Sequence, residues 1–307
     1  MAPAMINIAI IPGSACTLAE ASSVAAAIQQ HVTFNLQRTW HLSAVVTALE
    51  SLEAGYVPLF VHDGPVAADL TGYHTVEADG SYYAIVEYGP TWSLAASHEC
   101  LEMIVDPTGD RRQAGFSPTD SPTHVSFVVE VCDPCQDIAN ATTIGTWPMS
   151  DFVLPNYFSD HRVENASYSY SGHVKSPKQV LPGGSLSWID GDNVAWQLLN
   201  DSGSATVVSR GPYQPGPMAA REYMHQFEQN YPLLSKGPGS NAYLRRGRTK
   251  KRAYELASLK SLNRFLDDVS TRSGTTKQRA TTLQPRARRS AIPHSGNKSK
   301  PRSGEKR

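Results

Sequence analysis

The chain has 307 residues with 28 basic and 28 acidic side chains, so its formal net charge is zero. The charges are unevenly placed: residues 1–200 hold 6 basic and 21 acidic groups, a net charge of −15, whereas residues 201–307 hold 22 and 7, a net charge of +15. This split predicts an acidic folded body followed by a basic extension. Four cysteines are too few for a disulfide scaffold of this length.

The hydropathy pattern gives no sign of membrane insertion or export. No apolar run approaches the roughly 20 residues that span a bilayer. The first basic residue is Arg38, so the start of the chain lacks the charged region of a secretory signal. We therefore expect a cytoplasmic protein without a membrane span.

The first part of the chain alternates strand and helix patterns. A β-branched run closed by Pro12-Gly13 predicts an opening strand over residues 6–11. Residues 17–40 predict an amphipathic helix, whose apolar face is formed at four-residue spacing by Val24, Ile28, Val32, Leu36 and Trp40. Further strands are expected at residues 43–47, 57–61 and 82–88, with a Gly- and Asp-containing loop before the last of them.

A second helical pattern covers residues 93–105, and Thr91 or Ser93 can cap its start. Asp106 is expected to end this helix, because the residue before a proline is pushed out of the helical region. The rest of the acidic body predicts a strand over 124–131, an irregular Pro-containing segment over 150–158 and a closing hairpin over 181–199.

This order of elements predicts an α+β domain with two long helices over residues 1–200. Residues 201–307 are rich in Ser, Gly, Pro, Lys and Arg and predict a basic, mostly disordered extension with two short helical patterns, 218–231 and 252–268. A dense basic run at 245–252 predicts binding of nucleic acid or of an acidic partner through the extension.

The second predicted helix carries the pattern with the most chemical specificity, HExxE. His98 and Glu102 are four residues apart, so they project from one helix face and could meet at a single metal ion. Glu99 lies one step round the helix, where it could reach a metal-bound water without being a ligand. On a soluble helix, however, such a pattern is more often a solvated charged face.

Four strings in the chain, taken in order, resemble one known family. They are SHECLEMIVDP (97–107), VEVCDPC (129–135), SDFVLPNYF (150–158) and LPGGSLSWIDG (181–191). The set resembles the zincin metallopeptidase superfamily, and most closely a zincin-like family with the motif SHExxEMxxDP. The resemblance covers about residues 6–200. It implies a mixed twisted sheet, a zinc ion bound by His98 and Glu102, and Glu99 as the general base that activates water for peptide hydrolysis.

The third metal ligand is less obvious from the sequence. We predict Asp106, which lies eight residues after His98 and so about 12 Å along an unbroken helix, although the break at Pro107 could turn it back. Glu130 and Asp133 are the next candidates. Asp151 is a weaker one.

Two other interpretations remain open. A carboxylate in place of the second histidine adds negative charge to the metal, so the domain could be a non-catalytic metal-binding or interaction module. The Cys132-x-x-Cys135 pair could form half of a zinc site or a redox pair, but it is more often two partly buried thiols at a turn.

Overall fold

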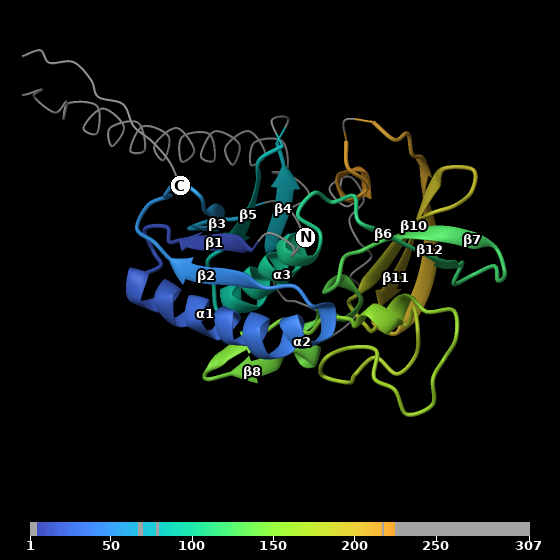
Figure 1. Ribbon diagram of the computed structural model, residues 1–307, viewed down its shortest axis with the longest axis horizontal. Helices are drawn as coiled ribbons and strands as arrows, with labels where there is room; N and C mark the ends of the chain where they lie inside the picture. The colour runs from blue at the N-terminus through green and yellow to red at the C-terminus, as the bar shows by residue number, and fades with distance from the viewer. Residues whose placement is uncertain (1–4, 67–69, 78–79, 217, 225–307) are drawn as a thin grey trace, which may run out of the picture.

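The computed structural model describes residues 5–66, 70–77, 80–216 and 218–224, which form a mixed α/β fold with two five-stranded sheets (Figure 1). The first sheet has the order β2-β1-β3-β5-β4 and contains β1 (Ile6–Ile11), β2 (Ala44–Ala48), β3 (Val57–His62), β4 (Gly72–Val76) and β5 (Tyr82–Glu87). The second has the order β12-β11-β10-β7-β6 and contains β6 (Arg112–Phe116), β7 (His124–Val128), β10 (Ser185–Ile189), β11 (Val194–Asp201) and β12 (Ser204–Pro212). A small hairpin is formed by β8 (Thr142–Ile144) and β9 (Trp147–Met149).

The first sheet is parallel except at one edge. β1 pairs in parallel with both β2 and β3, and β3 pairs in parallel with β5, whereas β4 runs antiparallel to β5. Alternate side chains of β1 enter different clusters: Ile8 and Ile10 join the main core, and Ala9 and Ile11 join a smaller cluster with Phe60. This alternation follows the two-residue period of a strand that is buried on both faces.

The first helical region consists of three consecutive segments. Helix α1 (Leu18–His31) begins at Thr17, whose side chain accepts a hydrogen bond from the backbone N–H of Glu20. It continues through a π-helical turn at Val32–Leu36 into α2 (Gln37–Trp40), which ends at a left-handed residue, His41. The predicted helical stretch over 17–40 is therefore divided into three segments, and four of its five predicted face residues are fully buried: Val24, Ile28, Val32 and Leu36.

Helix α3 (Trp92–Val105) lies between the two sheets in Figure 1 and packs against β4, β5 and β9. Twelve of its fourteen residues are buried, so it carries no broad solvated face. The helix ends at Asp106, as the following proline predicts. HExxE therefore lies on a core helix, and its charged groups need partners from the surrounding elements.

The second sheet is antiparallel throughout and extends further along the chain than the charge pattern predicted. The hairpin expected over 181–199 is confirmed by β10 and β11, with its turn at Asp190–Asn193. The predicted domain boundary at residue 200 falls inside β11, which pairs with β12 over its whole length. Strand β4 occupies part of the expected loop before β5, and β6 and β12 lie where no element was expected.

After β12, residues 218–224 pack back onto the domain, and helical geometry begins at Ala220. The remainder of the 218–231 helical pattern, the 252–268 pattern and the basic run at 245–252 lie outside the described residues. Among the described residues, none of the helices has the length and apolarity needed to cross a bilayer.

Candidate metal centre

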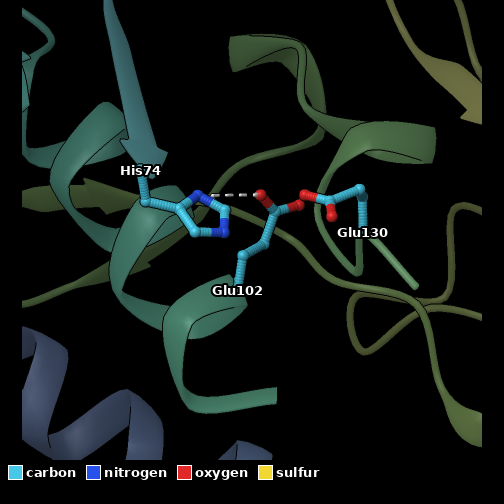
Figure 2. Close-up of side chains that lie close together, drawn as sticks. All are labelled: His74, Glu102 and Glu130. Atoms are coloured by element: carbon cyan, nitrogen blue, oxygen red, sulfur yellow. Dashed lines mark ion pairs between the residues drawn. The ribbon is translucent and has the colours of Figure 1, made fainter. Parts of the chain in front are cut away.

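Imidazole and carboxylate groups gather where α3 faces β4 and the segment after β7. Two groups of possible ligand atoms, each within 4.8 Å of one another, occur among the described residues. One contains His98, Glu99 and Glu102, and the other contains His74, Glu102 and Glu130. Figure 2 shows the second group, with His74 on β4, Glu102 on α3 and Glu130 beyond the end of β7. Glu102 belongs to both groups and is only 2% exposed.

His98 lies between two carboxylates. Its Nε2 atom is 3.2 Å from Glu102 Oε2 and 3.4 Å from Asp133 Oδ1. The side chains of His98 and Asp133 keep 14% and 16% of their surface exposed, so this is the side of the cluster open to solvent. Burial by itself lowers the pKa of His98, but the charge of Glu102 and the hydrogen bond to Asp133 raise it well above the usual value.

Asp133 is held by the first residue of β10. Ser185 Oγ donates a hydrogen bond of 3.1 Å to Asp133 Oδ2, which leaves Oδ1 facing His98. Gly184 permits this approach, because a Cβ at this position would lie 2.7 Å from the backbone oxygen of Asp133 and 2.6 Å from that of Pro134. Gly184 and Ser185 of the LPGGS segment therefore support the CDPC segment: the glycine leaves room for its backbone, and the serine holds Asp133.

Glu102 is fixed on both sides. Its Oε1 accepts a hydrogen bond of 3.0 Å from the backbone N–H of Cys132, and its Oε2 faces His98. Burial alone would raise the pKa of Glu102, but the charge of His98 holds it well below the usual range. Glu102 is therefore an ionised carboxylate in the core.

Glu99 points toward β4, where a histidine meets it. Glu99 Oε2 is 2.7 Å from His74 Nδ1. Gly72 on the same strand leaves room for the carboxylate, because a Cβ there would lie 3.1 Å from Glu99 Oε1. Burial raises the pKa of Glu99 to about 8, and the Glu102 carboxylate adds to the increase, whereas His98 opposes it.

Glu130 is the most isolated acidic group of the cluster. It is 6% exposed, and neither carboxylate oxygen has a hydrogen-bond partner within the described part of the chain. Figure 2 shows its carboxyl group facing that of Glu102. Burial, followed by the Glu102 charge, raises the pKa of Glu130 well above its usual value. The positive charge of Arg221 opposes this increase.

Asp106 is not brought into either group of donor atoms. Its carboxylate accepts hydrogen bonds from the backbone N–H groups of Asp110 (3.2 Å) and Arg111 (2.9 Å), which close the turn after α3. These bonds satisfy the negative charge that the end of a helix disfavours. The role of Asp106 as a metal ligand stays a prediction. Among the alternative third ligands named from the sequence, Asp133 is the one that lies beside His98.

The four strings that carry the family resemblance meet around α3. The backbone N–H of Ser150 donates to Ser97 Oγ at 2.8 Å, and that of Val153 donates to Val131 O at 2.7 Å. Together with the contact between the LPGGS and CDPC segments, these bonds join all four strings into one structural unit. Asp151 lies in this unit but uses its carboxylate to accept hydrogen bonds from Ser171.

Two residues of the centre had no distinguishing signal in the sequence. His74 lies in a segment that was expected to be a loop, and Arg221 lies beyond the expected end of the domain; its Nη1 atom is 2.6 Å from His74 Nε2. His124 and His173 are both exposed and belong to neither donor group. Cys132 and Cys135 are buried free thiols, which agrees with the simpler interpretation of this pair.

The chain was compared with protein-family models, with curated proteins and with solved structures. None of the three comparisons found a match. The inference of function therefore depends on the side chains of the centre and on the four strings that it joins.

Proposed function

We propose that the domain is a zinc-dependent peptide hydrolase of the zincin type. The observation that carries the proposal is the position of His98 Nε2 between Glu102 Oε2 and Asp133 Oδ1, with Glu99 grouped with His98 and Glu102. We assign His98, Glu102 and Asp133 as ligands and Glu99 as the general base. The geometry favours Asp133 over Asp106 as the third ligand.

His98 lies at ligand spacing from two carboxylates, and their charge suits a divalent ion; Asp133, like Asp106, lies outside the two groups whose donor atoms are all within 4.8 Å of one another. Bonds of 2.0–2.2 Å to a tetrahedral ion place neighbouring donor atoms about 3.3–3.6 Å apart, and His98 Nε2 lies 3.2 and 3.4 Å from the two carboxylate oxygens. Two buried or half-buried carboxylates would balance the charge of a divalent ion. A cation would also be attracted by the carboxyl group of Glu130, whose oxygens have no hydrogen-bond partner among the described residues.

Each side chain then has a separate task in hydrolysis. A bound zinc ion lowers the pKa of a water ligand toward ~7 and polarises the scissile carbonyl. Glu99 takes the proton from the attacking water and delivers it to the leaving amine. His74 holds one oxygen of Glu99 and leaves the other for this proton transfer. Asp133 and His98 lie on the side of the centre that keeps contact with solvent.

Metal analysis of the full-length protein tests the proposal. We expect about one zinc ion per chain, as the donor geometry implies, and loss of the metal in His98→Ala. Asp133→Asn and Asp106→Asn form a matched pair, because both keep the size of the side chain. The first should lower the metal content and the second should leave it unchanged, measured by inductively coupled plasma mass spectrometry.

Two results would change the assignment. A wild-type protein purified without chelators that contains no metal would exclude the hydrolase. A protein that loses its metal in Asp106→Asn but keeps it in Asp133→Asn would return Asp106 to the ligand set. A metal-loaded protein that cleaves no peptide would favour the non-catalytic metal-binding module, a role that the second carboxylate ligand also suits because it reduces the polarising power of the ion.

Adding a methyl group at Gly72 on β4 should displace the Glu99 carboxylate, the proposed general base, without contacting a proposed metal ligand. In Gly72→Ala the new Cβ would lie 3.1 Å from Glu99 Oε1 and 2.9 Å from Val86 Cγ1, so the carboxylate must move. We expect kcat for peptide hydrolysis to fall about ten- to a hundredfold, since small misplacements of a reacting group have effects of this size, while the zinc content stays constant. Gly89→Ala is the control, because no heavy atom lies within 4 Å of its Cβ. Equal kcat values for the two variants would contradict the placement of Glu99.

A further inference from the structure

The residues that follow β12 form a strap (residues 218–224) across the end of α3. The backbone N–H of Ala220 donates to Asp110 Oδ1 at 3.0 Å, and that of Arg221 donates to Gly109 O at 3.1 Å. The carboxylate of Glu222 accepts hydrogen bonds from Thr75 Oγ1 (2.8 Å) and from the backbone N–H of Val76 (2.7 Å). The strap therefore forms hydrogen bonds both with the turn after α3 and with β4, the strand that carries His74.

Arg221 extends from the strap into the centre. Its side chain is fully buried, and Nη1 contacts His74 Nε2 at 2.6 Å and the backbone oxygen of Asp106 at 3.1 Å. A guanidinium group has only donors, so His74 Nε2 must be the acceptor in this contact. A neutral imidazole that accepts at Nε2 carries its proton on Nδ1. His74 Nδ1 therefore donates to Glu99 Oε2, at 2.7 Å.

We propose that Arg221 is a positioning residue that fixes the tautomer of His74 and, through it, the orientation of Glu99. The hydrogen bonds run in one direction, from Arg221 to His74 to Glu99, and end on the carboxylate assigned as general base. The role in hydrolysis rests on the proposed function. The fixed tautomer itself does not, because it follows from the donor and acceptor chemistry of the three side chains.

The same chemistry excludes His74 as a metal ligand in this arrangement. His74, Glu102 and Glu130 have ligand atoms within 4.8 Å of one another, and Figure 2 shows His74 Nδ1 directed toward the carboxylates. Ligation through Nδ1 would require that atom to lose its proton. With Nε2 already accepting from Arg221, neither ring nitrogen would then carry a proton, which a neutral imidazole does not allow. His74 is therefore a hydrogen-bond donor to the centre.

Nitrogen-15 NMR of the imidazole rings in the full-length protein tests this proposal without any enzymatic assay. The His74 signals are identified by their absence from a His74→Asn sample. In the wild type we expect Nδ1 to have the shift of a protonated nitrogen and Nε2 that of an unprotonated acceptor. Arg221→Met keeps an unbranched side chain that fills part of the same space but removes the donor, so we expect the acceptor signature of Nε2 to disappear. Arg221→Lys, which keeps a donor, should retain it.

A matched control separates this effect from the general loss of a buried arginine. Arg210 on β12 is also buried and donates to Gln197, away from the centre. Arg210→Gln should leave the His74 signals unchanged, and circular dichroism should show that all variants are folded. A protonated Nε2 in the wild type, or an unchanged His74 in Arg221→Met, would overturn the proposal.

Kinetics then connect the tautomer to catalysis. If hydrolysis is detected, Arg221→Met should lower kcat about ten- to a hundredfold, the usual effect of removing a partner one shell out from the reacting groups, with KM and zinc content unchanged and with rescue by Arg221→Lys. A faster Arg221→Met enzyme would show that the strap blocks the centre and would overturn the positioning role. If no hydrolysis is found, the NMR result still decides whether Arg221 fixes the tautomer of His74. Failure of the hydrolase proposal can therefore be distinguished from failure of the proposed role of Arg221.

Discussion

Glu99→Gln is expected to lower kcat/KM for peptide hydrolysis by about 10²–10⁴, the contribution usually made by a general base, while the zinc content remains that of the wild type. Glutamine keeps the shape of the side chain and still accepts from His74 Nδ1, at 2.7 Å in the wild type. It cannot take a proton from water. The measurement is steady-state hydrolysis of a peptide library, paired with metal analysis of the same samples.

Glu102→Gln is the comparison for this variant. It lies three residues further along α3, and we expect it to lose the metal as well as the activity, because its Oε2 is 3.2 Å from His98 Nε2. A Glu99→Gln protein with wild-type activity would remove Glu99 from the mechanism. Loss of zinc in Glu99→Gln would make it a ligand instead.

A chain that ends at Asn200 is expected to be severely destabilised. It would lack β12, Tyr213 and the strap. Tyr213 and Met224 of the strap are buried in one cluster with Val128, Ile189 and Ala195 of the second sheet. Burial of such side chains contributes about 1.5–3 kcal/mol each, so the free energy of unfolding should fall by at least about 3–6 kcal/mol. Total stabilities are commonly ~5–15 kcal/mol, and such a fragment should be largely unfolded.

A chain that ends at residue 231 is the control for this truncation. It keeps all the described residues, so we expect its urea midpoint, followed by circular dichroism, to match that of the full-length protein. Equal midpoints for the two truncated chains would contradict the assignment of β12 and the strap to the folded domain.

Local sequence patterns were sufficient for elements with a clear period. The four-residue spacing in α1, the Asp106-Pro107 end of α3 and the turn between β10 and β11 all match the structure. Local patterns were insufficient for β4. Its five residues include a glycine and a histidine and show no clear strand pattern, and the strand is held by pairing with β5. The predicted end of the domain followed charge and composition, which do not record that β12 pairs with β11.

The centre was predictable only where its residues share a helix. The i, i+4 relation of His98 and Glu102 can be read from the sequence, because helix geometry sets it. The approach of Asp133 depends on the loop at Gly184, and the approach of His74 depends on strand pairing; neither leaves a spacing in the chain. Arg221 reaches the centre from 115 residues beyond Asp106, a contact that tertiary packing alone creates.

The contact between Glu222 and β4 has a consequence for the behaviour of the protein at high concentration. β4 is an edge strand, and the backbone N–H of Val76 points away from β5, because the neighbouring Glu77 N–H bonds across the hairpin to Ser81. An exposed edge of this kind is a template for sheet-to-sheet aggregation. Glu222 covers this donor with a carboxylate, so a strand from another molecule would have to displace a charged group before it could pair there. The strap thereby blocks one of the outward-facing backbone donors of this edge strand.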